Sequence, residues 1–389
     1  DSPVIAGKYS RQIDLTPIGS AVDNYLDLVG DDAAAIRISD AQIAKYRQLV
    51  LQARALFHSH HYGDYHFLLT LSNYTSHGGL EHHQSSDDRA RGGARMFADA
   101  EHFMLDASLL PHEYVHSWNG KFMRPDQLWQ PDFERPEHTN MLWMYEGLTV
   151  YLGDMLTVRS GLWSSDTWRQ VVAYRAAVLA HRTGRAWRPL IDTASAAQLL
   201  YGSPAAWSNW RRQTDFYPEG ELMWLAVDSK IRTLSHDRHS LDDFAAHFFS
   251  MNSGSLVTHA YTFNDVVSEL SAVQPYDWNT FLHNWLDGVG QQVPLLSGIE
   301  ASGWRLVYTD KLSHYEDALE NVGAGESSAT GINAMFSVGL FLTQSGRIDD
   351  VLWNGPAFKA GLAPGMTIIA INDHPYSSNV LRTEIAQAK

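Results

Sequence analysis

The sequence of 389 residues contains no cysteine, which excludes disulfide bonds and zinc sites built from thiolates. Any metal bound by this chain must therefore be held by histidines and carboxylates. Lys and Arg number 29 against 44 Asp and Glu, giving a net charge of −15, and the basic residues form no run. We expect no binding to nucleic acid, because a phosphate backbone needs clustered cations.

The sequence also lacks an apolar run of about 18 residues, the length that a membrane-spanning helix requires. Its first twenty residues have neither the basic start nor the apolar core of a signal peptide. The chain starts at Asp1 without a methionine, and we expect residues 1–20 to be the end of a longer N-terminal β region. Apolar residues make up 44% of the chain, which is typical of a folded globular protein.

Apolar spacing and capping residues predict a mostly helical central part. A helix is predicted from Ser39 to Phe57, followed by a strand from Tyr65 to Ser72. Further helices are predicted at residues 108–120, 140–160, 165–182, 218–234, 241–249, 262–272 and 278–287. Beyond about residue 291 the chain changes to short β-prone runs broken by glycine. We therefore predict an α+β fold with a domain boundary near residue 295.

The segment Pro111-His112-Glu113-Tyr114-Val115-His116 carries two histidines four residues apart. On a helix this spacing places both imidazoles on one face, where they can bind a single Zn²⁺ ion. Glu113 lies one position round the helix, where its carboxylate can reach a metal-bound water instead of the metal. The pattern H-E-x-x-H also occurs by chance, so a third ligand is needed to support it.

Glu146 is the candidate for that third ligand. It lies 30 residues after His116, between Trp143-Met144-Tyr145 and Gly147-Leu148. An unpaired carboxylate would be costly to bury in such an apolar context. A solvated glutamate at a helix turn is the alternative.

These motifs carry a family resemblance. The run from His112 to Lys121 is similar to the H-E-x-x-H-x-W-x-G segment of the aminopeptidase N superfamily, a gluzincin-type group, and Tyr145-Glu146-Gly147 is similar to its glutamate-ligand segment. The longer spacing between the two resembles the glycyl aminopeptidases, zinc metallopeptidases that carry a C-terminal PDZ domain. The resemblance implies a thermolysin-like catalytic domain over residues 21–294 with one zinc ion.

Two further motifs support the resemblance. Gly78-Gly79-Leu80-Glu81-His82 is similar to the family's G-x-M-E-N signature, which implies that the strand at Gly78 and Gly79 lies beside the substrate. The resemblance also implies that Glu81 binds the substrate's free α-amino group, a charge-assisted contact.

Tyr217-Pro218-Glu219-Gly220 resembles the family's Y-P-x-G segment. The resemblance implies that the Tyr217 hydroxyl stabilises the oxyanion that forms during hydrolysis. Glu219 stands where the family commonly has lysine, which puts the local electrostatics in doubt.

The C-terminal region, residues 295–389, resembles a small β-rich PDZ domain. Ser337-Val338-Gly339-Leu340-Phe341 is similar to a carboxylate-binding loop that enters a strand, and Pro356-Ala357 to Gly365 is similar to the following PDZ segments. Such a module can capture a C-terminal peptide by strand addition. The chain ends after the second expected helix, so we expect the module to be truncated.

Together these patterns predict a zinc-dependent aminopeptidase that removes small N-terminal residues, glycine or alanine, from peptides with a free N-terminus. In this hypothesis Glu113 and Tyr217 are catalytic, while His112, His116 and Glu146 hold the zinc. Two alternatives stay open: an endopeptidase with the same zinc chemistry, and a PDZ-type peptide-binding protein with a structural metal. Because family members are often exported in bacteria, the resemblance favours a periplasmic or extracellular location and leaves a cytoplasmic one open.

Overall fold

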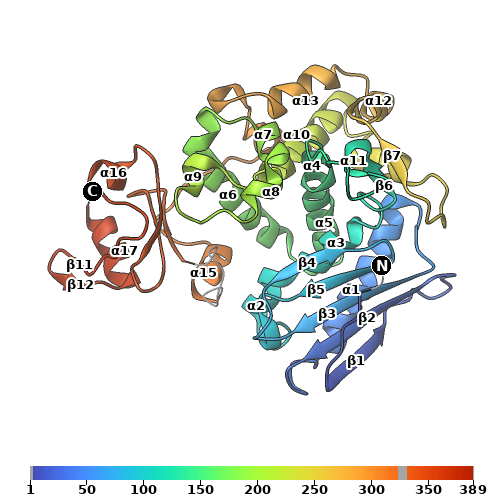
Figure 1. The fold of residues 1–389 in the computed structure, drawn as a ribbon, viewed down its shortest axis with the longest axis horizontal. Helices are drawn as coiled ribbons and strands as arrows, with labels where there is room; N and C mark the ends of the chain where they lie inside the picture. Colours follow the sequence, from blue (N-terminus) through green and yellow to red (C-terminus); the bar gives the residue numbers. More distant parts are fainter. Residues whose placement is uncertain (1–2, 323–330, 389) are drawn as a thin grey trace.

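The N-terminal part of the chain forms a five-stranded sheet in this computed structural model, which describes residues 3–322 and 331–388 (Figure 1). In the order β1-β2-β3-β5-β4, the strands are β1 (Tyr9–Asp14), β2 (Asp23–Gly30), β3 (Asp64–Leu71), β5 (Ser85–Arg89) and β4 (Gly78–Glu81). β2, β3 and β5 run parallel, while β1 and β4 are antiparallel edge strands. β1 pairs with β2 along its whole length, so these N-terminal residues belong to the same sheet as the rest.

The helix predicted after Ser39 is present as α1 (Asp40–Phe57) and connects β2 to the parallel strand β3. Ser39 and Gln42 form a reciprocal capping box at its start, which satisfies two amide groups that the helix leaves free. In β3 every second side chain is buried, beginning with Tyr65 and Phe67. This alternation shows that one face of the strand lies in the core.

Helices dominate the middle of the chain. They are α2 (Ala100–Asp106), α3 (Leu109–Val115), α4 (Leu142–Tyr145), α5 (Gly147–Arg159), α6 (Ser165–Ala180), α7 (Leu190–Ser195), α8 (Ala197–Leu200), α9 (Ser208–Arg211), α10 (Pro218–Ser235), α11 (Leu241–Phe249), α12 (Phe263–Val273), α13 (Trp278–Leu286) and α14 (Ser297–Ala301). Two short strands, β6 (Met123–Pro125) and β7 (His259–Tyr261), pair parallel to each other. The helices predicted from residue 165 to residue 287 are confirmed within a few residues.

The helix predicted from residue 140 to residue 160 is wrong in one respect, because it is broken at Glu146. This residue ends α4 and begins α5. A Cβ atom on Gly147 would lie 2.8 Å from the carbonyl oxygen of Phe216 and 2.9 Å from the Cα of Gly220. The break thus occurs where α5 meets the start of α10 with backbone against backbone.

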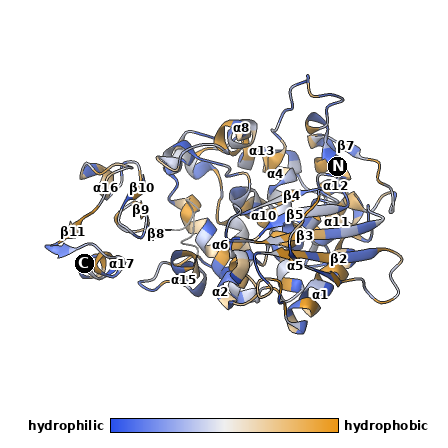
Figure 2. Ribbon diagram, turned by 60° about the horizontal axis from the view of Figure 1, so that its bottom comes forward, coloured by the Kyte–Doolittle hydropathy of each residue, from blue (hydrophilic) through white to orange (hydrophobic). Residues whose placement is uncertain are grey.

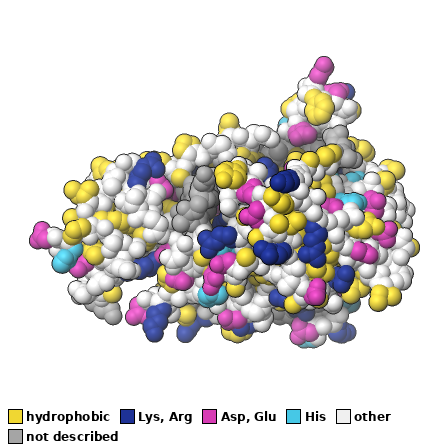
Figure 3. All heavy atoms as spheres, turned by 90° about the horizontal axis from the view of Figure 1, so that it is seen from below, with side chains coloured by type: hydrophobic (Ala, Val, Ile, Leu, Met, Phe, Trp, Pro, Cys, Tyr) yellow, Lys and Arg dark blue, Asp and Glu magenta, His cyan; other side chains and the backbone are white. Residues whose placement is uncertain are grey.

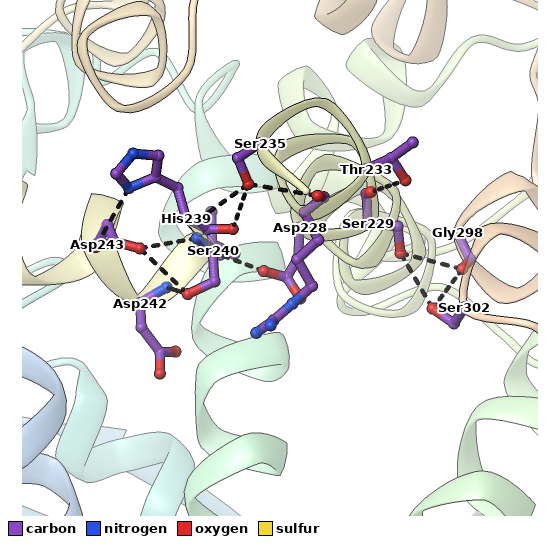
Figure 4. A network of polar contacts seen from close by, with 12 residues as sticks. Asp228, Ser229, Thr233, Ser235, His239, Ser240, Asp242, Asp243, Gly298 and Ser302 are labelled. Carbon is purple, nitrogen blue, oxygen red and sulfur yellow. Dashed lines mark hydrogen bonds and ion pairs between the residues drawn. The ribbon is translucent and has the colours of Figure 1, made fainter. Parts of the chain in front are cut away.

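Helix α10 lies at the centre of the helical part and links several other helices. The Asp228 carboxylate accepts hydrogen bonds from the Tyr151 hydroxyl of α5 and from the first amide of α11, at 3.1 and 2.7 Å. The next residue of α10, Ser229, donates a hydrogen bond to the Gly298 carbonyl of α14 (Figure 4). A Cβ on Gly298 would lie 2.7 Å from the Ala226 nitrogen, so α14 packs directly on the backbone of α10. These contacts hold the helix whose first turn carries Tyr217.

Residues beyond α14 form a smaller module with its own buried cluster. Its elements are α15 (His314–Asn321), β8 (Ile332–Ala334), β9 (Leu340–Leu342), β10 (Ile348–Val351), α16 (Pro356–Lys359), β11 (Ala370–Ile371), β12 (His374–Pro375) and α17 (Ser378–Gln387). The main core includes Ile299 and Ala318, whereas the second core begins at Ile332. The two cores are therefore separate, and the domain boundary near residue 295 stays a prediction. Residues 1–2, 323–330 and 389 lie outside the described ranges.

Strand β9 has neighbours on both sides in this module. It pairs with β10 on one edge and with β8 on the other, where Ile332 faces Leu342 and Ala334 faces Leu340. Peptide capture by strand addition needs a free strand edge. In the described structure both edges of β9 are already paired, one with β10 and one with β8.

The module contacts the helical part through α9. Asp350 accepts hydrogen bonds from the Ser208 hydroxyl and the Asn209 amide at 2.7 and 2.9 Å, and Trp353 stacks on Trp210. A cavity of about 1160 Å³ lies between α6, α10 and the module. Its lining includes none of the three predicted zinc ligands.

Hydrophobic and polar residues are mixed both along the secondary-structure elements and on the surface. Figure 2 shows hydrophobic and hydrophilic residues alternating along the strands and helices, as expected for elements with one buried face. On the face seen in Figure 3, acidic and basic side chains lie interspersed. Among the described residues, no helix has the length and hydropathy needed to cross a membrane.

Candidate active site

The three predicted zinc ligands come from two neighbouring helical segments. His112 lies in α3 and His116 caps its C-terminus, while Glu146 lies at the break between α4 and α5. A Cβ on Gly153 would lie 3.0 Å from the Cα of His112. The absence of that atom lets α5 approach α3 closely enough for Glu146 to reach both imidazoles.

The ligand atoms of the three residues form a small triangle. The Nε2 atoms of His112 and His116 are 3.2 Å apart. Glu146 Oε2 lies 3.4 Å from Nε2 of His112 and 3.2 Å from Nε2 of His116. All three side chains therefore point to one place, and they form the only such His, Asp and Glu group within the described ranges.

This triangle has the dimensions of a zinc site. Donors placed tetrahedrally at about 2.0–2.1 Å from one ion lie about 3.3–3.4 Å from each other. Glu146 Oε2 is buried and has no hydrogen-bond partner among the described residues, a costly arrangement for a carboxylate unless a cation binds it. Two imidazoles and one carboxylate leave a fourth position for water, as catalytic zinc sites do. The residues present thus fit a catalytic zinc ion.

Asn119 connects the two halves of this cluster. Its carbonyl oxygen lies 2.9 Å from Nδ1 of His116, so that nitrogen carries the proton and Nε2 is free to bind a metal. Its side-chain amide donates to the carbonyls of Met144 and Tyr145 and to the Thr149 hydroxyl, at 2.9, 3.1 and 3.0 Å. One buried side chain therefore fixes the broken helix relative to the histidines.

Charge around the cluster favours a cation. Burial lowers the pKa of His116, but the carboxylates of Glu146, Glu81 and Glu113 outweigh this effect and raise it to about 9. Burial would raise the pKa of Glu146, yet the two imidazoles hold it low. Three carboxylates thus act on the point where the imidazoles meet.

Glu113 lies beside the cluster and against the sheet. Its carboxylate is buried, and burial raises its pKa well above the usual range. A raised pKa suits a group that takes up a proton and later releases it. A Cβ atom on Gly79 would lie only 2.0 Å from Glu113 Oε1, so the backbone of edge strand β4 sits directly on this carboxylate.

The structure places Gly78, Gly79 and Glu81 together on β4, whose outer edge is unpaired in the described sheet. The Glu81 carboxylate lies near enough to the histidines for its charge to favour the protonated forms of His112 and His116. Its Oε1 atom accepts a hydrogen bond from the Tyr145 hydroxyl at 2.5 Å and lies 3.2 Å from Lys121 Nζ. Burial would raise the pKa of Glu81, but His116 and Lys121 lower it, so this side chain is a carboxylate.

Tyr217 stands at the other side of the cluster, at the start of α10. Its ring centre is 6.1 Å from that of His112. Burial, with Glu146 nearby, raises its pKa well above the usual value, which keeps the hydroxyl protonated as a donor. The hydroxyl of Tyr201, which follows α8, lies 2.5 Å from the hydroxyl of Tyr217.

Glu219, where the family resemblance leads one to expect lysine, lies in a buried ion-pair network. Its carboxylate accepts hydrogen bonds from Arg185 Nε at 3.0 Å and from Arg212. Arg212 also binds Asp215 at 2.7 Å. The network fixes the turn that leads into Tyr217, and two arginines balance the charge of Glu219.

Four residues at the site lie outside the catalytic and ligand roles predicted from the sequence: Asn119, Lys121, Tyr145 and Tyr201. The first three lie within or next to the two ligand motifs. Their closeness to the ligands in the sequence could therefore have marked them as candidate site residues. Tyr201 lies in a segment without any motif, and only the fold brings it to Tyr217.

Comparisons with known proteins cover the segment that holds the ligand cluster. Residues 106–223, which contain the three candidate ligands and Tyr217, match the model of the family described as M61 glycyl aminopeptidase. An aminopeptidase N family protein from Idiomarina loihiensis has the same fold, with a TM-score of 0.74 and 21% identity over 97% of this chain. The chain spans 62% of that protein's length. No curated protein matches the chain.

Two other solved structures are less similar. An M1 zinc metallopeptidase from Deinococcus radiodurans has a TM-score of 0.41 and 14% identity, covering 72% of this chain and 52% of its own. Leukotriene A4 hydrolase from Saccharomyces cerevisiae has a TM-score of 0.43 and 16% identity, covering 72% of this chain and 39% of its own. The family match thus covers the segment that holds the two zinc-ligand motifs and Tyr217, whereas residues 78–82 lie outside the matched residues.

Proposed function

We propose that this protein is a zinc-dependent aminopeptidase that removes small N-terminal residues from peptides. The observation that carries the proposal is the triangle of His112 Nε2, His116 Nε2 and Glu146 Oε2, with sides of 3.2 to 3.4 Å. Glu113 lies next to this triangle without belonging to it. A metal site that serves structure alone has no use for such a base.

When bound by His112, His116 and Glu146, zinc would polarise the scissile carbonyl and lower the pKa of a water molecule. Glu113 takes the proton from the attacking water and gives it to the leaving amine. The Tyr217 hydroxyl donates a hydrogen bond to the carbonyl oxygen as that oxygen gains negative charge. Donors of this kind contribute about 2.7–4 kcal/mol to the rate-limiting barrier in other hydrolases.

In this proposal Glu81 makes the enzyme specific for substrates with a free N-terminus. Glu81 lies on the edge strand, and its carboxylate binds the hydroxyl of Tyr145, the residue before the ligand Glu146. An α-ammonium group bound there would place the first peptide bond of the substrate next to the cluster. The preference for glycine or alanine rests on the family match alone.

Hydrolysis of glycyl- and alanyl-p-nitroanilide tests the proposal. The purified protein is assayed before chelation, after chelation and after zinc is added back, beside the variant Glu113→Gln, which keeps the shape of the side chain. We expect activity that disappears with the metal, returns with zinc and is absent in the variant. A protein that binds no zinc would refute the proposal.

A second assay separates an aminopeptidase from an endopeptidase. An unblocked peptide and the same peptide with an acetylated N-terminus are digested in parallel. We expect cleavage of the unblocked peptide alone, because Glu81 needs a cationic partner. Equal cleavage of both peptides would show an endopeptidase.

For the C-terminal module we propose a PDZ-like arrangement, based on the sequence of its strands and helices from β8 to α17. The proposal does not include a peptide added to β9, because β8 and β10 already pair with both edges of that strand. A peptide ligand would need another surface of the module.

A further inference from the structure

One oxygen of Glu81 makes both polar contacts that the described structure gives to this side chain, a hydrogen bond and an ion pair. The Tyr145 hydroxyl lies 2.5 Å and the Lys121 ammonium 3.2 Å from Oε1. Oε1 is thus held by a neutral donor and a cation. The other oxygen, Oε2, has no hydrogen-bond partner in the described ranges, and the Glu81 side chain is 17% exposed. It is therefore open to a ligand.

The backbone next to the histidines makes room for this arrangement. Gly120 has a φ of +129°, which an L side chain rarely adopts. A Cβ atom at Gly120 would lie 2.5 Å from the Tyr145 ring and 2.7 Å from its hydroxyl oxygen. Tyr145 itself is buried. The lack of a side chain at Gly120 thus leaves space for the buried Tyr145 ring, whose hydroxyl binds Glu81.

We propose that Tyr145 and Lys121 belong to the amine-recognition site, in which they hold Glu81 by Oε1 and leave Oε2 to bind the substrate's α-ammonium group. This inference rests on the proposed aminopeptidase function. Tyr145 is the positioning residue: its neutral hydroxyl fixes the carboxylate without adding charge. A carboxylate held in one orientation loses less conformational entropy when it binds a ligand.

Lys121 has a different effect because it is charged. Its ammonium balances the buried carboxylate, but it also repels a second ammonium bound to the same group. Tyr145 therefore strengthens amine binding, whereas Lys121 weakens it. The two side chains together set how tightly the site holds an N-terminus, including that of a released amino acid.

The test uses two ligands that differ only in the amine. Alanyl-p-nitroanilide carries the α-ammonium, and propionyl-p-nitroanilide has a hydrogen in its place and serves as a competitive inhibitor. In the zinc-loaded protein, we expect Tyr145→Phe to raise KM for the alanyl compound about tenfold, as loss of a hydrogen bond to a charged group does. The inhibition constant of the propionyl compound should stay within about twofold of its original value.

A double variant shows whether Tyr145 acts through Glu81. In a Glu81→Gln background, Tyr145→Phe should change KM no further. The matched control is Tyr151→Phe, which removes another buried phenol that donates to a carboxylate, that of Asp228 at 3.1 Å, and it should leave both constants unchanged. Equal effects of Tyr145→Phe on both ligands, or a further loss in the Glu81→Gln background, would overturn the proposal.

Lys121→Met provides an independent variant if Tyr145→Phe does not fold. We expect KM for the alanyl compound to fall several-fold, with the propionyl constant unchanged, and Lys121→Arg to behave as the original protein. A rise in KM would overturn the charge argument. Failure of the proposed function is seen separately, since the original protein would then not hydrolyse the alanyl compound at all.

Discussion

The contact between Gly79 and Glu113 allows the role of Glu113 to be tested without changing its chemistry. In Gly79→Ala, the new Cβ would lie 2.0, 2.4 and 2.7 Å from the Oε1, Cδ and Cγ atoms of Glu113. Carbon and oxygen atoms that are not bonded need about 3.2–3.4 Å. The carboxylate must therefore move by more than about 1 Å, while the three predicted ligands remain in place.

The expected loss follows from this displacement. Misplacing a reacting group by about 1 Å costs about a hundredfold in rate, so kcat should fall by about that factor. The free energy of unfolding should fall by about 1–3 kcal/mol, because the added methyl group displaces a buried side chain. Zinc binding should be unchanged, since Glu113 is not part of the ligand triangle.

The assay combines kcat for alanyl-p-nitroanilide with zinc content per chain and the melting temperature. Gly63→Ala is the matched control, directly before β3 of the same sheet: its Cβ would lie 3.5 Å from Oε1 of Gln84, an ordinary contact. We expect that control to keep activity within about threefold. If Gly79→Ala keeps full activity, Glu113 does not act from the position seen here. If it loses zinc as well, the loss of rate has another cause.

Three other variants test separate contacts. Asn119→Ala should weaken zinc binding by about 10–100-fold in a metal titration, since it frees the broken helix that carries Glu146. Burial raises the pKa of Asp88 to about 7, so the folded state keeps a proton that an unfolded aspartate loses above about pH 4. The free energy of unfolding should thus fall by roughly 4 kcal/mol between about pH 4 and pH 7 relative to Asp88→Asn in urea titrations, and parallel curves for the two proteins would contradict this. Tyr201→Phe should lower kcat about three- to tenfold, with no further loss in a Tyr217→Phe background, because its hydroxyl bonds to that of Tyr217.

Local patterns in the sequence predicted the features that depend on neighbouring residues. The helix start at Ser39 and the helix end at Phe249 appear in the structure as predicted, because helix ends are decided by a few adjacent side chains. The i,i+4 spacing of His112 and His116 brings their Nε2 atoms to within 3.2 Å of each other. In this case the spacing along the sequence was enough to predict that the two side chains lie together on one helix face.

Features that depend on distant segments could not be predicted in the same way. The helix break at Glu146 arises where Gly147 touches the backbone of Phe216 and Gly220, about 70 residues later. The pairing of Glu81 with Lys121 and Tyr145 joins three elements, and no periodicity links them. The family resemblance assigned Glu81 a role but said nothing of the two side chains that hold it.

The positions of the site residues explain why periodicity fails there. Glu81 ends strand β4, His116 caps α3, Glu146 lies in a helix break and Tyr217 precedes α10. At such positions the backbone leaves the regular pattern, so a side chain can point along an element instead of away from it. Side chains from four elements can then meet at one point, which regular faces of packed helices would keep apart. The same irregular backbone leaves amide and carbonyl groups unpaired, and Asn119 binds two of these carbonyls. The helix break that turns Glu146 toward the histidines therefore also needs a partner such as Asn119 to be stable.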